Sequence, residues 1–145
     1  MLEKMKALAR GKDICVLATV SGSKPHCSLM AYATDDQCRE IYMVTHKQTK
    51  KYKNLKENPF VSLLIDTRDE DMGRNRLKAR ALTVDGTFQD IEDQAKKGVI
   101  RGRVLKRHPH LEEFANHPDA EVLAINVSSF LLLEGLTDSY FEMLD

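Results

Sequence analysis

The residues best suited to chemistry are a threonine and two lysines, Thr49, Lys50 and Lys51, in the stretch VTHKQTKKYKNLKENP. The spacing of the apolar residues changes here from two to three, which predicts a strand over 40–46 and a helix from Lys50 to Glu57. Its N-cap is expected to be Thr49 or Gln48, and Thr49 is chemically the better cap. Lysines at a helix N-terminus oppose the helix dipole unless an anion binds there. The stretch favours either a phosphate site or a solvated lysine-rich helix, and charge alone favours the helix.

Length and composition indicate an ordinary soluble domain. The chain has 145 residues, of which 42% are hydrophobic and 30% charged, so we expect a single domain over 1–145 with a substantial core. No apolar run is long enough to cross a membrane and no signal-peptide pattern is present, so we expect a cytoplasmic protein. The 22 basic and 22 acidic residues balance, which argues against nucleic acids and membrane surfaces as general partners.

The three cysteines, Cys15, Cys27 and Cys38, predict neither a disulfide framework nor a metal site. Their number is odd and no CxxC pair occurs, which indicates a reducing compartment. Cys15 and Cys27 fall in predicted strands, where a free thiol behaves as a small buried apolar residue. The five histidines form no convincing ligand set with these thiols. Spacing indicates no Ser-His-Asp or Cys-His arrangement for nucleophilic catalysis.

The rest of the pattern describes the elements that must hold the lysine stretch in place. An amphipathic helix is expected over 2–10, a glycine-weakened basic helix over 91–107 and a short helix over 111–116. Hairpin connections indicate about six antiparallel strands, with a bulge or bend at Asp85-Gly86. The expected strand segments are 14–20, 25–34, 40–46, 60–66, 77–89, 121–127 and, after a kink at Ser128-Ser129, 130–136.

The first of these strands, 14–20, predicts how the sheet is covered. Ile14, Val16 and Val20 form one of its faces, and the alternate residues, among them Leu17, form the other. Both faces are largely apolar, so both need to be buried. In a small chain such strands indicate a closed barrel whose outside is also covered. A second copy of the chain is the simplest cover, and we therefore expect a homodimer.

With these elements in place, the sequence resembles the pyridoxamine 5′-phosphate oxidase-like flavoproteins, the FMN-binding split barrels. The resemblance covers roughly 13–136 and rests on the order of strands, the block VTHKQTKKYKNLKENPFVSL and the strand ALTVDGT. Its most specific part is the run 45–63, in which a hydroxyl residue and two basic residues precede Asn-Leu, Asn-Pro and an apolar strand. The resemblance implies a mainly β fold with flanking helices, a six-stranded antiparallel split β-barrel of the FMN-binding type.

The resemblance also implies FMN as the cofactor, in a cleft at the subunit interface of the homodimer. In the family the hydroxyl and basic pair hold the FMN phosphate, and here these are Thr49, Lys50 and Lys51, so the phosphate interpretation overtakes the solvated helix. The flavin ring lies against the second and third strands, where backbone groups can address its polar edge. Plain core packing is the alternative for the apolar members of that set. The implied ring contacts are Ser28, Leu29, Met30, Ala31, Val44 and Thr45.

The chain departs from the oxidase itself where the oxidase recognises its substrate. No Lys or Arg lies between Lys24 and Arg39, although the oxidase places basic residues on its second strand, and only His26 is near. Ala81 stands where the oxidase has a glutamine. The chain has no Trp, and no Arg follows Arg107. The resemblance therefore implies a retained flavin site without the site for vitamin B6 phosphates.

Three functions are compatible with these residues. The leading one is an FMN-dependent oxidoreductase of unassigned substrate, with a nicotinamide nucleotide as candidate donor; no side chain stands out as its catalytic acid or base. The second is a non-catalytic flavin or haem carrier or sensor of the same fold. The third is a nucleic-acid module that uses the basic segments 47–56 and 96–107. It ranks low, because only Tyr52 offers a stacking platform in the first segment.

The basic segment 96–107, KKGVIRGRVLKR, has two interpretations of its own. As a helix it is expected to place Val99, Val104 and Leu105 on an apolar face. It either covers the flavin cleft and attracts an anionic donor, or it is a solvated helix that balances the acidic loop 66–71. The second interpretation is favoured.

Overall fold

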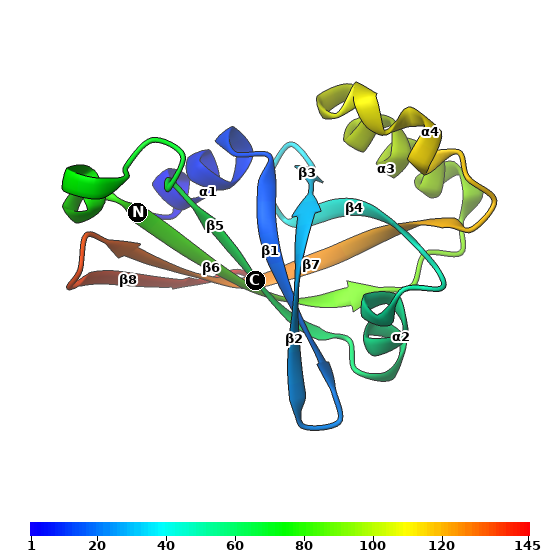
Figure 1. The fold of residues 1–145 in the computed structure, drawn as a ribbon, viewed down its shortest axis with the longest axis horizontal. Helices are drawn as coiled ribbons and strands as arrows, with labels where there is room; N and C mark the ends of the chain where they lie inside the picture. Colours follow the sequence, from blue (N-terminus) through cyan, green and yellow to red (C-terminus); the bar gives the residue numbers. More distant parts are fainter.

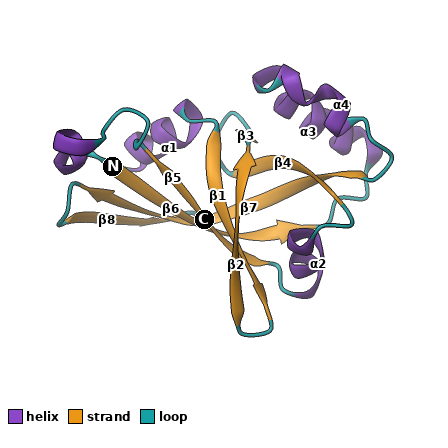
Figure 2. Ribbon diagram, in the orientation of Figure 1, coloured by secondary structure: helices purple, strands orange, loops and turns teal.

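The chain folds as a mainly antiparallel β structure with helices at its periphery (Figure 2). This computed structural model describes all of residues 1–145. None of the helices has the length and apolar character needed to cross a membrane. The helices are α1 (Leu2–Gly11), α2 (Lys50–Glu57), α3 (Gln94–Arg107) and α4 (Glu112–Ala115), with 3-10 turns η1 (Gly73–Lys78) and η2 (Pro109–Leu111). The strands are β1 (Ile14–Ser21), β2 (Lys24–Ala31), β3 (Ala33–Thr34), β4 (Glu40–His46), β5 (Phe60–Asp66), β6 (Arg80–Gln89), β7 (Ala120–Glu134) and β8 (Asp138–Met143).

All eight strands belong to one curled sheet in the order β2-β1-β5-β6-β7-β4-β3, with β8 paired to β7. Every neighbouring pair is antiparallel. The long strand β7 pairs with β6 on one side, while β4 and β8 share its other side. The predicted mainly β split barrel with flanking helices is confirmed, whereas the predicted number of six strands is wrong.

Strand β8 was not expected and the expected strand 25–34 is divided into β2 and β3, whereas β7 joins two expected strands into one. Ser129 pairs with Asp85 on β6 and with Met143 on β8, so one strand runs through the position where a kink was expected. Strand β8 has the sequence DSYFEM, whose polar residues do not announce a strand. The irregularity predicted at Asp85-Gly86 is confirmed as a register shift of β6 against β7, in which Ser128 has no paired residue on β6. A Cβ on Gly86 would collide with the backbone oxygen of Asn126.

The barrel interior is the larger of two hydrophobic cores and contains 22 buried residues. Helix α1 contributes Met5 and Leu8 to it, and α2 contributes Leu55. The two helices lie on opposite sides of the barrel in Figure 1. The hydroxyl of Tyr32, the residue between β2 and β3, donates to the carbonyl of Ala9 at 2.5 Å. This bond fixes α1 against the point where the chain passes from one end of the sheet to the other.

A second core of eight buried residues lies outside the sheet, between β4, β7 and the helices α3 and α4 (Figure 1). Helix α3 contributes Ile100 and Val104, both fully buried. This corrects the expected apolar face of the basic segment, because Val99 is 60% exposed and Ile100 takes its place. Positions four apart share a helix face, whereas adjacent positions lie about 100° apart.

The opposite half of the outer sheet face, over β2, β1 and β5, lies bare over much of its area. Ile14 is 45% exposed and Leu29 is 76% exposed. Within a single chain only one face of 14–20 is buried, so the expected cover of the other face by a second copy stays a prediction. Cys27, expected to be buried, is exposed because it lies on this outer face opposite Ala18.

Candidate functional site

The barrel is split between β2 and β4, which are linked at one end only. Strand β3 continues the chain from β2 and pairs with β4 through residues 33–34 and 41–42. Before that point β2 pairs only with β1, and beyond it β4 pairs only with β7. Each strand therefore presents a free backbone edge, over 24–31 and 43–46, whose N–H and C=O groups can bind a ligand. The residues predicted to contact a flavin ring lie on these two edges.

The turn after β4 leads into α2, whose N-terminus has the features of an anion site. Thr49 is its N-cap, as predicted: the hydroxyl accepts a hydrogen bond from the N–H of Tyr52 (3.4 Å) and donates to the carbonyl of His46 (2.8 Å). The N–H groups of Lys50 and Lys51 have no acceptor within the chain. Two free donors at the positive end of a helix favour a bound anion.

The lysine side chains at this end of α2 lack acidic partners. Lys47 and Lys56, on either side of them, each approach a carboxylate, at 4.0 and 2.5 Å respectively. No carboxylate lies within 4.0 Å of the amino group of Lys50 or Lys51. Two positive charges thus remain uncompensated beside two free N–H groups, and one phosphate could engage all four.

The four predicted positions on β2 point alternately to the two faces of the sheet. Met30 is buried in the barrel core, and Ser28 shares its face. Leu29 and Ala31 face outward, and Leu29 is exposed. On the inner side, a ligand can reach the backbone of this stretch and the Ser28 hydroxyl. Plain core packing is therefore the role of the Met30 side chain but not of Leu29.

The two predicted positions on β4, Val44 and Thr45, are both buried. Val44 packs against α3 in the second core, so its side chain turns away from the barrel interior. The hydroxyl oxygen of Thr45 lies 3.4 Å from that of Thr49, which joins the β4 edge to the N-cap. The structure therefore brings Thr45 together with Thr49, Lys50 and Lys51, and leaves the β2 positions as a second group.

A buried hydrogen bond places α2 relative to that second group. The side-chain amide of Asn54 donates to the hydroxyl of Thr19 on β1 at 3.1 Å. Thr19 pairs with His26 across the β1–β2 hairpin, and Leu17 pairs with Ser28. Because paired residues point to the same side of a sheet, His26 and Ser28 face the side on which α2 packs.

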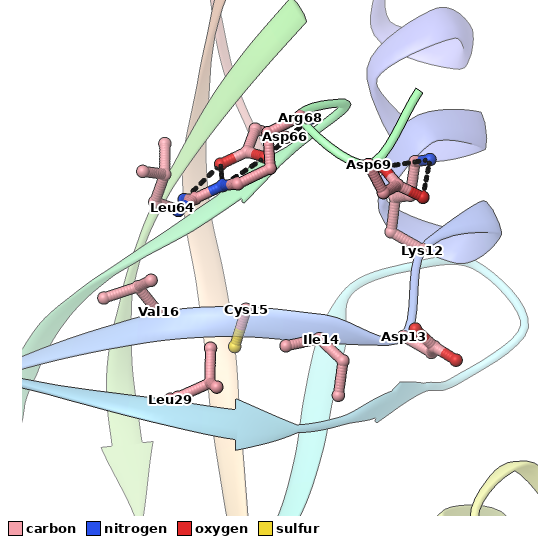
Figure 3. A pocket seen from close by; sticks show the side chains of 10 residues that line it. All are labelled: Lys12, Asp13, Ile14, Cys15, Val16, Leu29, Leu64, Asp66, Arg68 and Asp69. Atoms are coloured by element: carbon pink, nitrogen blue, oxygen red, sulfur yellow. Dashed lines mark hydrogen bonds and ion pairs between the residues drawn. The ribbon is translucent and has the colours of Figure 1, made fainter. Parts of the chain in front are cut away.

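The outer face holds a separate cavity of about 240 Å³, beside Leu29 (Figure 3). On its rim Arg68 donates to the carboxylate of Asp66 at 2.6 and 2.9 Å, and this pairing lowers the pKa of the Asp66 carboxyl. Cys15 also lines the cavity, but burial raises the pKa of its thiol to about 12. A neutral thiol is a poor nucleophile, so this cavity contains no activated cysteine.

Comparison with known families identifies the chain. The family model described as pyridoxamine 5′-phosphate oxidase matches residues 1–133. The chain belongs to the pyridoxamine 5′-phosphate oxidase family. A search of curated protein sequences gave no match.

Solved structures with the fold of this family include one protein described as binding haem and another described as binding FAD. A haem-binding protein from Mycobacterium smegmatis has a TM-score of 0.85 at 16% identity, over 97% of this chain and 57% of its own length. A FAD-binding protein from Mesorhizobium loti has a TM-score of 0.75 at 17% identity, over 91% of each chain. A candidate pyridoxamine 5′-phosphate oxidase from Listeria innocua has a TM-score of 0.71 at 23% identity, over 90% of this chain and 96% of its own. These similarities establish the fold, and the chain spans little more than half of the mycobacterial protein.

The basic residues of α3 have partners other than those expected. Arg103 pairs with Asp36 at 3.0 Å and Lys97 with Glu121 at 3.1 Å. The acidic loop 66–71 is paired instead with Lys12 and Arg68. The interpretation that α3 balances this loop is therefore wrong, while steering of an anionic donor by α3 stays a prediction.

The structure adds one residue to the candidate site that sequence reasoning missed. Asp119, in the loop between α4 and β7, accepts hydrogen bonds from the N–H groups of Lys47 (2.9 Å) and Gln48 (3.1 Å). Gln48 and Asp119 are 71 positions apart, so no local period or motif relates them.

Proposed function

We propose that this chain is an FMN-binding flavoprotein and an oxidoreductase. The observation that carries the proposal is the N-terminus of α2, where Lys50 and Lys51 supply two free N–H groups and two uncompensated charges. FMN ends in a phosphate, which accepts charge-assisted hydrogen bonds from several donors at once. When bound, FMN supplies hydride or electron transfer, and the protein binds and orients it.

In this proposal the flavin ring lies along the free edge of β2. The backbone groups of 28–31 on the side away from β1 have no strand partner, and they complement the donors and acceptors of the ring's polar edge. Ser28 and His26 point to the side of the sheet on which α2 packs. The phosphate and ring contacts are therefore on one side of the sheet.

We also propose that two copies of the chain associate through the bare outer face, with the flavin at the border of their interface, where the free edge of β2 meets the split. One row of cross-strand neighbours runs over this face from β2 to β8, and five of its six residues are apolar: Leu29, Val16, Leu64, Thr83, Leu131 and Phe141. In this row Leu29, Leu131 and Phe141 are 76%, 41% and 58% exposed. A continuous exposed apolar row is typical of a protein–protein contact.

Vitamin B6 phosphates are poor substrate candidates in this proposal. Beyond Lys24, β2 carries no Lys or Arg that could hold a second phosphate. Lys50 and Lys51 lie at α2, where the FMN phosphate would use them. A nicotinamide nucleotide is the proposed electron donor.

Reconstitution and cofactor release test the proposal. The protein, as purified or after incubation with FMN, is expected to show flavin absorbance, and heat should release FMN rather than FAD. Anaerobic mixing with NADH or NADPH should then bleach the flavin band. A protein that binds no FMN after reconstitution would refute the proposed cofactor. Bound FMN that neither nucleotide reduces would refute the proposed donor.

A non-catalytic haem or flavin binder is the second candidate, and the similarity to a haem-binding protein favours it. Haem carries two propionates, so the same two lysines could pair with it. Titration of the apoprotein with haem and with FMN separates the two candidates. A Soret band that shifts at one equivalent, with no flavin binding, would support the haem protein.

A further inference from the structure

The turn that precedes the candidate phosphate site is held by a single residue from a distant loop. Asp119 accepts two successive backbone N–H groups, that of Lys47 through its carbonyl at 2.9 Å and that of Gln48 through its carboxylate at 3.1 Å. The next residue, Thr49, is the N-cap of α2. The loop between α4 and β7 therefore holds the turn that leads into α2.

Asp119 is itself held in place by stacked rings. Its N–H donates to Nδ1 of His117 at 3.0 Å, and the His117 ring stacks on His46 with centroids 4.6 Å apart. The other face of His46 stacks on Phe114 at 4.1 Å, and its Nε2 lies 3.1 Å from the carbonyl oxygen of Phe114. These contacts link the end of β4, the loop between α4 and β7, and the turn that leads into α2.

These contacts also involve the residues next to the groups that would bind phosphate. The hydroxyl of Thr49 donates to the carbonyl of His46, the middle ring of the stack. The N–H groups of Lys50 and Lys51 can converge on one anion only while the turn 46–49 keeps its geometry. The two central side chains of this turn are exposed, so hydrogen bonds rather than packing maintain its shape.

We infer that Asp119, oriented by His117, positions the phosphate-binding turn and thereby sets the preference for FMN over riboflavin. The inference rests on the proposed flavin site. A carboxylate close to an anion site opposes the anion, so its presence here needs a separate reason. That reason is the pair of N–H groups that Asp119 orients, and an uncharged oxygen acceptor at this position would serve the same purpose.

The affinities of three proteins for FMN and riboflavin test this inference: the parent, Asp119→Ala and Asp119→Asn. Alanine removes the side-chain acceptor, whereas asparagine keeps an oxygen acceptor and removes the charge. We expect Asp119→Ala to weaken FMN binding about tenfold, the effect of one charge-assisted hydrogen bond, and riboflavin binding less than about threefold. Asp119→Asn should bind FMN at least as tightly as the parent.

Asp93→Ala is the matched control, because Asp93 makes the same kind of bond at another helix, accepting the N–H of Ala95 at the start of α3. It should leave the ratio of the two affinities unchanged. Equal weakening of FMN and riboflavin by Asp119→Ala, or an asparagine variant as impaired as alanine, would overturn the inference. If Asp119→Ala does not fold, His117→Phe keeps the stacked ring without the Nδ1 acceptor. It should lower FMN affinity selectively, and an unchanged ratio would overturn the inference.

A double variant, Lys50→Ala with Lys51→Ala, separates failure of this inference from failure of the proposed function. A parent protein that binds FMN no better than riboflavin has no phosphate site, and the proposed function fails with the inference. If the lysine variant loses a preference for FMN that Asp119→Ala retains, the inference alone fails.

Discussion

The two halves of the outer sheet face, built from similar residues, have different surroundings. Over β4 and β7, the helices α3 and α4 bury a second core of eight residues. Over the half that runs from β2 to β8, large apolar side chains remain exposed, among them Leu29, Leu131 and Phe141. Figure 1 shows both helices gathered over one end of the molecule. Whether an apolar side chain on this outer face is buried therefore depends on whether α3 and α4 cross its half of the face.

This contrast separates a half that is covered within one chain from a half that a second copy covers in the proposed dimer. On the covered half three basic residues of α3 are paired within the chain: Lys96 with Glu40, Lys97 with Glu121 and Arg103 with Asp36. The bare half has no comparable cover. The split that contains the candidate cofactor site lies between them, since β2 belongs to the bare half and β4 to the covered half. Four predictions test this contrast.

The largest effect is expected from Leu131→Glu on the bare half. A twofold interface would bury two such carboxylates, and an unpaired buried charge costs about 3–5 kcal/mol. The dimer dissociation constant should therefore rise by at least about a hundredfold, measured by sedimentation at micromolar concentration. Val99→Glu, at a more exposed position but on α3, should stay dimeric. A parent protein that sediments only as a monomer with flavin bound would contradict the proposed dimer.

On the covered half, Ile100→Ala should lower the free energy of unfolding by about 2–5 kcal/mol, because it leaves a cavity between α3 and β4. Urea denaturation measures this loss. The neighbouring Val99→Ala, at an exposed position, should change stability by less than about 0.5 kcal/mol. Similar losses from the two variants would mean that α3 does not pack on the sheet through the Ile100 face.

At the split, the double variant Lys50→Ala with Lys51→Ala should weaken FMN binding more than riboflavin binding. Each charge-assisted hydrogen bond lost costs about 1.5–3 kcal/mol, and only FMN has the phosphate that makes these bonds. Fluorescence titration with each flavin measures the difference. Lys53→Ala, on the same helix but away from its N-terminus, is the control. An equal loss for both flavins would contradict the phosphate assignment.

The smallest effect concerns the thiols on the two sides of the sheet. At pH 8 a thiol reagent should label the exposed Cys27 first, and more slowly in the dimer than in Leu131→Glu. Burial raises the pKa of Cys15 to about 12, so its thiol should react only on unfolding. Because this pKa is raised above the ordinary value of 9.0, the contribution of Cys15 to stability is complete below about pH 9 and falls as the pH rises towards 12. Equal labelling rates for Cys15 and Cys27 in the folded protein would contradict the burial of Cys15 and the exposure of Cys27.

Local features of the fold could be predicted and longer-range ones could not. The predicted helix from Lys50 to Glu57, with its Thr49 cap, is confirmed, because capping and helical period act over a few residues. The predicted burial of Cys27 and Val99 is wrong, since burial depends on what packs over a face. The strand count is wrong partly because β8 is held by pairing with β7 rather than by its own pattern.

By itself the sequence determined the strand and helix around Thr49, the irregularity at Asp85-Gly86 and membership of the family. Each of these depends on residue types within a short segment, or on their order along the chain. Only the tertiary structure decided that Leu29 is exposed while Val44 is buried, although both are apolar strand residues. The structure also placed Asp119 beside the turn that starts α2. Such contacts depend on how the sheet curls and on where α3 and α4 cross it, because residues far apart in the chain meet only after packing.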